Sequence, residues 1–185
     1  LLNSPSCLFS VNKFYNDLRS RGVAVSKDTL HNMLEHLSDA YLFFPVTIFS
    51  NSERQKQVNP RKVYPIDPGL AYACGPPGNR DLGHLLETFV FLQLRRQGYD
   101  IHYYRTRSGR EVDFITRNSD GQQGLIQVCA DMSVKTTRDR EIKALQEAMT
   151  ELSIHEGVIV TLDEQETITG RNGSIQVMPA WAVAN

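Results

Sequence analysis

The first part of the chain carries two stretches whose apolar residues recur at helical spacing. Ser10 can cap one helix and Gly22 can end it, and Ser26 can cap a second helix a few residues later. The apolar positions are Val11, Phe14, Tyr15 and Leu18 in the first stretch, and Leu30, Met33, Leu34 and Leu37 in the second. Two helices joined so closely predict a helix-turn-helix.

Two runs rich in β-branched and aromatic residues follow, at 41–49 and 62–66, with a polar loop over 50–61 between them. Helix, turn, helix and hairpin are the elements of a winged helix in their usual order. That fold commonly lays its second helix in the DNA major groove and its hairpin against the backbone. The candidate nucleic-acid contacts are Lys27, Thr29 and Asn32 on the helix and Arg54, Lys56, Arg61 and Lys62 on the hairpin. Acidic residues on the same helix offset its charge, so an adaptor role through protein contacts stays open.

The segment Cys74-Gly75-Pro76-Pro77-Gly78-Asn79 contains residues that neither a helix nor a strand tolerates in its interior. We therefore predict a winged-helix domain over residues 1–74, a linker over 75–79 and a second domain over 80–185.

The second domain shows alternating helix and strand patterns. An apolar helix is predicted over 81–97, ended by Gly98, and an amphipathic helix over 137–152. Strands are predicted over 101–105, 111–116, 125–130, 157–162, 166–168 and 175–178. The apolar strand after the amphipathic helix predicts a crossover back into the same sheet. The chain as a whole is expected to be α+β or α/β, a winged helix followed by a mixed sheet flanked by helices.

Side-chain direction brings polar residues together in this predicted sheet. Asp113 and Gln127 lie on neighbouring strands and can converge, and Glu87 can join them if its helix packs beside the strands. With the backbone carbonyl of Val128, these groups would form an oxygen-rich cluster. Such ligands suit Mg²⁺ or Mn²⁺, the ions that bind the scissile phosphate and activate water in phosphodiester hydrolysis.

Composition narrows the alternatives. The net charge is −1 and the pI is near 6.6, so attraction to nucleic acid has to come from local patches. The three cysteines are an odd number without short spacing, which favours a reducing, cytoplasmic setting. No stretch has the length and apolarity of a membrane span. The sequence has no phosphate-loop motif, so ATP hydrolysis is excluded as its own activity.

Several passages of the chain resemble the PD-(D/E)XK, or restriction-endonuclease-like, superfamily, and specifically the C-terminal region of bacterial and archaeal AAA+ ATPase-like proteins. The passages in the second domain are Leu86-Glu87-Thr88-Phe89-Val90, Tyr103-Tyr104-Arg105 with Glu111-Val112-Asp113-Phe114, and Ile126-Gln127-Val128-Cys129 with Thr137-Arg138-Asp139-Arg140-Glu141. The first domain resembles the winged helix of the same proteins, including Tyr64-Pro65-Ile66-Asp67-Pro68-Gly69-Leu70. Because the chain starts at Leu1 rather than Met, we expect it to be a fragment of a longer polypeptide. The resemblance implies that this polypeptide supplies an ATPase domain.

The resemblance implies a role for each residue of the cluster. Glu87 would support metal or water, Asp113 would bind metal, and an acid at position 127 would bind it too. A lysine at position 129 would activate water or stabilise the transition state. This chain has Gln127 and Cys129 at those two positions. An amide is a poorer Mg²⁺ ligand than a carboxylate, and a thiol does not supply a permanent cation.

A cation from elsewhere in the chain can in principle replace the absent lysine. Lys135 precedes the amphipathic helix, and Arg138 and Arg140 lie at its start. Electrostatic catalysis depends on where such a cation is placed. Cys129 itself fits a small buried hydrophobic residue better than a nucleophile, because free cysteines are commonly buried.

Three functions are therefore open. The first is a nucleic-acid-associated module with a degenerate, inactive nuclease-like site, serving an ATPase domain. The second is an active Mg²⁺- or Mn²⁺-dependent DNA endonuclease with a migrated lysine or arginine. The third is a protein-interaction or regulatory platform without nucleic-acid binding. In the simplest alternative for the acidic residues, Glu111 and Asp113 are ordinary strand charges that pair with Arg105, Arg107 or Arg110.

Overall fold

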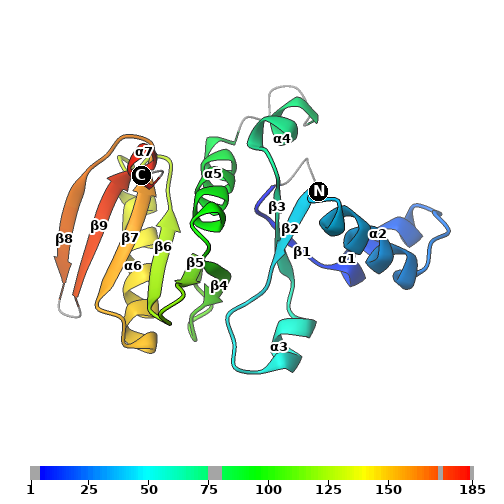
Figure 1. Cartoon of the computed structure of the whole chain (residues 1–185), viewed down its shortest axis with the longest axis horizontal. Coiled ribbons are helices and arrows are strands. Elements are labelled where there is room, and N and C mark those ends of the chain that lie inside the picture. Colours follow the sequence, from blue (N-terminus) through cyan, green and yellow to red (C-terminus); the bar gives the residue numbers. More distant parts are fainter. Residues whose placement is uncertain (1–4, 75–80, 171–172, 184–185) are drawn as a thin grey trace. The chain divides into compact units, whose positions relative to one another are not determined.

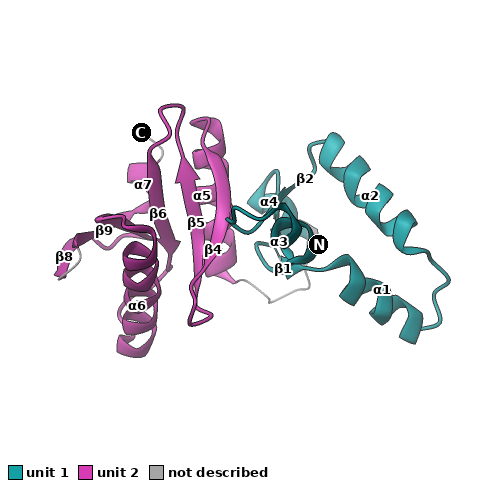
Figure 2. Cartoon of the chain, turned by 90° about the horizontal axis from the view of Figure 1, so that it is seen from below, with its two compact units in different colours: residues 1–79 teal, residues 80–185 magenta. Residues whose placement is uncertain are grey.

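A computed structural model describes residues 5–74, 81–170 and 173–183 of the chain (Figure 1). The chain divides into two compact units, residues 1–79 and 80–185 (Figure 2). Most of the turn-rich segment, including the predicted linker over 75–79, lies outside the described residues.

The first unit combines a three-stranded antiparallel sheet with helices. Its elements are β1 (Leu8–Phe9), α1 (Val11–Ser20), α2 (Lys27–Asp39), β2 (Phe43–Val46), α3 (Glu53–Val58), β3 (Arg61–Pro65) and α4 (Pro68–Cys74). The strands lie in the order β1-β3-β2, so β3 is central. The predicted helix-turn-helix and hairpin correspond to α1, α2, β2 and β3. The structure adds one strand, β1, and two helices, α3 and α4.

Local chemistry explains where α1 and α2 begin. The hydroxyl of Ser10 accepts a hydrogen bond from the backbone N–H of Lys13, and that of Ser26 accepts one from Thr29. Gly22, just after α1, has a φ of +76°, which glycine adopts without strain. The predicted capping residues and the stop after the first helix are confirmed.

Other features of the first unit also differ from the predictions. The segment expected to be a polar loop contains α3, whose first turn is capped by Ser52. The expected strand over 41–49 is shorter, because only Phe43–Val46 pair with β3. Met33 was expected to face inward, but its side chain is 55% exposed.

The second unit contains a six-stranded mixed sheet with the order β4-β5-β6-β7-β9-β8. Its elements are α5 (Leu82–Arg96), β4 (Asp100–Arg105), β5 (Glu111–Arg117), β6 (Gln123–Val128), α6 (Lys135–Leu152), β7 (Glu156–Thr161), β8 (Glu166–Gly170), β9 (Gly173–Pro179) and α7 (Ala180–Val183). β7 is parallel to both β6 and β9, and the other neighbouring pairs are antiparallel. The predicted crossover through α6 is confirmed, as is the mixed α+β class. The short α7 was not predicted.

The sheet of the second unit is covered on both faces. Phe91 of α5 stacks against Phe114 of β5, with 6.3 Å between ring centroids. Asp113 precedes Phe114 and so points to the opposite face, where it shares a cavity with residues of α6. Leu145 and Met149 of α6 are buried on that side. The two long helices therefore pack on opposite faces of β5.

Candidate functional site

A cavity of about 510 Å³ lies on the α6 face of the sheet, beside β5 and β6. It is lined by the β4–β5 turn, the two strands and the first half of α6. The lining residues are Ser108, Gly109, Arg110, Glu111, Asp113, Gln127, Arg140, Glu141 and Ala144. Most of these side chains are charged or polar, so the cavity is suited to polar chemistry.

A chain of hydrogen bonds crosses the floor of this cavity. The Oε1 atom of Gln127 accepts from the backbone N–H of Asp113 at 3.2 Å, and its Nε2 donates to Oε2 of Glu141 at 2.8 Å. The other oxygen of Glu141 accepts from the Arg140 guanidinium at 2.6 and 2.9 Å. Gln127 thus links β5 to α6, with an acceptor at one end of its amide and a donor at the other.

Asp113 is held in place by β6. Phe114 pairs with Ile126 in the antiparallel ladder, which brings Asp113 and Gln127 to neighbouring positions on the same face. One carboxylate oxygen of Asp113 accepts a hydrogen bond from the backbone N–H of Val128 at 2.9 Å. Asp113, Gln127 and Glu141 are all buried, each less than 9% exposed. Their positions are consequently fixed by several contacts each.

The β4–β5 turn is fastened to α6 by acidic side chains of the helix. Glu147 accepts hydrogen bonds from the hydroxyls of Thr106 and Ser108 and from the guanidinium of Arg110. These bonds, that of Ser108 first, lower the pKa of Glu147 below its usual value. One turn later, Glu151 accepts from the hydroxyl of Tyr104 at 2.7 Å. These contacts hold the outer wall of the cavity.

The charges lining the cavity are of both signs and largely paired. Arg110 lies 2.9 Å from Glu147, and Arg140 lies 2.6 Å from Glu141. The hydrogen bond to Glu141 raises the pKa of Arg140, so this guanidinium is a permanent cation. Glu111 forms an ion pair with Arg105 at 3.3 Å, as the simplest interpretation of the strand charges expected. The cavity is therefore not strongly charged overall.

Comparison with known proteins identifies the second unit. A family described as Domain of unknown function (DUF4143) matches residues 82–183, which is more than half of the chain. The chain belongs to this family. No solved structure matches it.

Two relatives of this DUF4143 protein are themselves described as uncharacterized. It is 32% identical to Uncharacterized protein MJ1544 of Methanocaldococcus jannaschii over 98% of its own length, and it covers 42% of that relative. It is 31% identical to an uncharacterized protein of Haemophilus influenzae over 65% of its length, covering 30% of that one. The chain therefore spans less than half the length of both relatives. No helix in the described part of the DUF4143 protein is long and apolar enough to cross a membrane.

Two residues of the expected cluster are not among the described residues that line the cavity. Glu87 is a buried residue of α5, one helical turn before Phe91, and it is not among the described residues that line the cavity. Cys129 follows the end of β6, is 7% exposed and donates its S–H to the Asp131 carbonyl at 3.2 Å. Burial raises the pKa of the Cys129 thiol. These properties are those of a buried hydrophobic thiol rather than a reactive one.

The basic residues at the cavity also differ from the expected one. Lys135 is exposed as the first residue of α6 and is not among the described lining residues. Arg138 pairs with Glu166. Of the arginines suggested at the start of that helix, only Arg140 lines the cavity.

The donor atoms near Asp113 are engaged within the protein. The amide oxygen expected to bind a metal accepts from the Asp113 N–H, and the amide nitrogen faces Glu141. In the described ranges, no group of three or more His, Cys, Asp or Glu side chains is arranged to hold a metal ion. Because the amide atoms are already hydrogen-bonded, they do not fit a divalent cation well. Binding of a metal by Glu87, Asp113, Gln127 and the Val128 carbonyl is not tested by the structure and stays a prediction.

Residues assigned to nucleic-acid contact on the second helix are exposed. Thr29 and Asn32, together with His36, repeat at helical spacing on one face of α2. The amino group of Lys27 lies 5.3 Å from the centre of the Tyr15 ring, within the range of a cation–π contact. His31 does not share this face, because it lines a cavity between α2 and the sheet of the first unit.

The basic residues expected on the hairpin are distributed over α3 and β3. Arg54 and Lys56 lie on α3, where Lys56 pairs with Glu53 at 2.8 Å. Arg61 is exposed at the start of β3. Lys62 was expected to be exposed as well, but it is 3% exposed. Successive strand residues point to opposite faces, and Lys62 points away from the face that carries Arg61.

Sequence reasoning did not place Glu141 or Arg110 in the cavity, and Arg110 was considered only as a possible ion-pair partner of Glu111 or Asp113. A signal for Glu141 was present, because it lies four residues before Leu145 and therefore on the inner face of the predicted amphipathic helix. A carboxylate on an apolar face requires a partner, which Gln127 and Arg140 supply. No comparable signal pointed to Arg110, since its position depends on the fold of the β4–β5 turn.

Proposed function

We propose that this DUF4143 protein is a nucleic-acid-associated module of a longer, ATPase-like protein, and that its nuclease-like site is catalytically inactive. The observation that carries the proposal is the amide of Gln127, which bridges Asp113 and Glu141 through hydrogen bonds at both ends. The resemblance places a metal-binding acid at this position. An amide that donates to the neighbouring carboxylate needs no cation to hold the two groups together.

The environment of Cys129 supports the same conclusion. Nuclease chemistry of the resembled superfamily requires a cation at this position, whereas the thiol is buried and its raised pKa keeps it neutral at physiological pH. Asp113 remains, with one oxygen bound to the Val128 N–H. The geometry thus favours a structural role for residues that would perform catalysis in an active relative.

A cleavage assay tests the inactive site. The purified chain is incubated with supercoiled plasmid and with single-stranded DNA in Mg²⁺ or Mn²⁺, and we expect no cleavage. Cleavage that disappears in Asp113→Ala would overturn the proposal. As a positive control, Gln127→Glu with Cys129→Lys restores the acid and the lysine, and circular dichroism verifies that this variant is folded. We expect metal-dependent nicking from the restored variant.

A binding assay tests the association with nucleic acid. The exposed face of α2 supports this part of the proposal, since Thr29 and Asn32 are polar and unburied there. We expect duplex DNA to bind with an affinity that falls steeply with salt, measured by fluorescence anisotropy. Lys27→Ala with Asn32→Ala should weaken binding about tenfold or more, as expected for two lost contacts. Lys143→Ala, an exposed lysine of α6, is the matched control. No binding at low salt would favour a protein-interaction platform instead.

An active endonuclease is the second candidate, and one observation favours it. Arg110 and Arg140 line the same cavity as Asp113, so two guanidinium groups lie where a migrated cation would be needed. Their ion pairs with Glu147 and Glu141 reduce their effect on a bound phosphate. If cleavage occurs with Mg²⁺ or Mn²⁺, its loss in Arg140→Ala or Arg110→Ala identifies the cation.

A further inference from the structure

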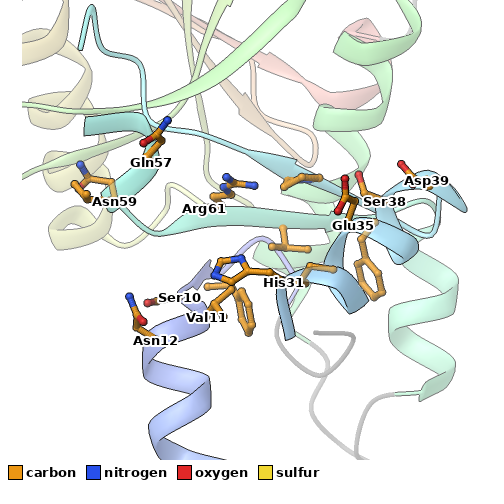
Figure 3. A pocket seen from close by; sticks show the side chains of 16 residues that line it. Ser10, Val11, Asn12, His31, Glu35, Ser38, Asp39, Gln57, Asn59 and Arg61 are labelled. Carbon is orange, nitrogen blue, oxygen red and sulfur yellow. The ribbon is translucent and has the colours of Figure 1, made fainter. Parts of the chain in front are cut away.

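The first unit contains a cavity of about 540 Å³ between α2 and the sheet (Figure 3). Its volume is within the range of 300–1,000 Å³ that is typical of ligand sites. Apolar side chains from the sheet and from α1, α2 and α3 form much of its lining. They include Phe9, Val11, Leu34, Phe43, Val58 and Val63. This cavity is separate from the α2 face proposed for nucleic acid, because Thr29 and Asn32 do not line it.

The apolar surfaces around this cavity are incompletely buried. α1 has apolar residues at helical spacing, yet none of its residues is buried, and Leu30 alone is buried in α2. Phe14 is 39% exposed, and Val58 at the end of α3 is 72% exposed. Amphipathic helices normally bury their apolar stripe against another element. The first unit therefore presents apolar surface to which a further element can add.

The rim of the cavity carries acidic groups on one side. Glu35 and Asp39 lie one helical turn apart on α2, and Figure 3 shows them together at one end of the cavity. At the opposite end are the amides of Gln57 and Asn59, with Arg61 between the two ends. Among the described residues, neither carboxylate is within an ion-pair distance of a basic side chain. The acidic end thus has unneutralised negative charge.

One face of α2 forms a wall of the cavity over two helical turns. His31, Leu34, Glu35, Ser38 and Asp39 all face the cavity, which is the spacing of one helix face over two turns. At 1.5 Å per residue these positions extend over roughly 12 Å. Recognition of a helix in a groove uses apolar anchors at positions i, i+3 or i+4, and i+7, which match such a length.

We propose that this cavity is the docking site for an amphipathic helix of a partner, inserted by its apolar side and carrying lysine or arginine next to Glu35 and Asp39. The apolar lining accepts the anchors, and the acidic end fixes the direction of the helix. Electrostatic complementarity of this kind sets orientation and specificity more than affinity. The nucleic-acid face of α2 remains accessible while the cavity is filled.

Fluorescent peptides of about 16 residues, long enough to form a helix, test the proposal. A basic peptide has leucines at i, i+3, i+4 and i+7 and lysines at one end. An acidic peptide has glutamates in place of those lysines, and a scrambled peptide has the basic composition without the helical spacing. We expect the full chain to bind the basic peptide at least about tenfold more tightly than either of the others.

Charge reversal on the rim distinguishes this site from general attraction. Glu35→Lys with Asp39→Lys should invert the preference, so that the acidic peptide binds more tightly. Glu156→Lys with Asp163→Lys makes the same charge change at exposed residues of the second unit and should leave the preference intact. Equal binding of the scrambled peptide, or equal effects of the two double variants, would refute the proposal. Self-association that depends on Glu35 and Asp39, measured by sedimentation, would make a second copy the occupant and would refute it too.

Discussion

Gln127 connects a strand and a helix of the second unit through a single side chain. Replacing it with alanine leaves the Asp113 N–H without its side-chain acceptor and removes the amide donor from buried Glu141. We expect Gln127→Ala to lower the free energy of unfolding by about 1–3 kcal/mol, the cost of leaving buried polar groups unsatisfied. Urea denaturation measures the change. Gln123→Ala is the control, since Gln123 is an exposed residue of the same strand. Similar losses in the two variants would contradict the assigned role.

Cys129 should behave as an unreactive thiol. Burial first, and then the nearby carboxylate of Glu141, raises its pKa above the ordinary value of 9.0, so the thiolate fraction is lower at every pH below that value. In a variant with Cys7→Ser and Cys74→Ser, we expect iodoacetamide to modify Cys129 more slowly than a free cysteine peptide. The rate should keep rising through pH 9 without a plateau, because the thiolate is the reacting form. Modification as fast as the peptide at pH 7 would contradict a buried, neutral thiol.

At the candidate site, the sequence predicted the residues on the strands better than those on the helices. Asp113 and Gln127 converge because strand alternation and the pairing of neighbouring strands follow directly from local pattern. Whether Glu87 joined them depended on which face of the sheet α5 covers, and no local pattern carries that information. The same limit applies to Arg110, which reaches the cavity through a turn.

At the scale of elements, Gly157 determines how closely α6 approaches the sheet. A Cβ added at this position would lie 2.9 Å from Cδ2 of Leu145 and 3.1 Å from Sδ of Met149. Gly157→Ala should therefore destabilise the protein by roughly 1–3 kcal/mol through overpacking. Leu145→Ala removes the obstructing side chain, so the double variant should be less destabilised than the sum of the single variants. Thermal or urea unfolding of the four proteins measures this coupling, and strict additivity would show that the contact is unimportant.

The helices that were predicted correctly are the long ones, and most of them begin at a capping residue. α1, α2, α5 and α6 have periodic apolar residues over ten or more positions, and Ser10, Ser26 and Asp81 accept hydrogen bonds at three of their starts. The elements that were missed, β1, α3, α4 and α7, have between two and seven residues. Periodicity cannot be recognised over so few positions, and such elements form because of tertiary contacts.

At the scale of the whole molecule, the second compact unit has the core of an independent domain. The second unit has a core of fully buried apolar side chains, including Val90, Phe114, Leu145 and Ile159. We expect residues 80–185, produced separately, to retain native circular dichroism and a cooperative urea transition, as an independent domain does. The control is the full-length chain measured under the same conditions. A non-cooperative transition of the separate unit would show that it depends on residues 1–79.

The order of strands in the second unit delays the pairing of β6 with β7 during synthesis. The middle of its sheet pairs β6 with β7, and 28 positions separate Val128, where β6 ends, from Glu156, where β7 begins. At a synthesis rate of roughly 5–20 residues per second, the ribosome needs about 1 to 6 s to deliver that partner strand. The antiparallel strands β4, β5 and β6 are complete before then, but one edge of β6 still lacks its neighbour. A nascent chain therefore passes through an interval in which this apolar edge can pair with wrong partners. The interval ends when α6 and β7 have both been synthesised and β7 pairs with β6.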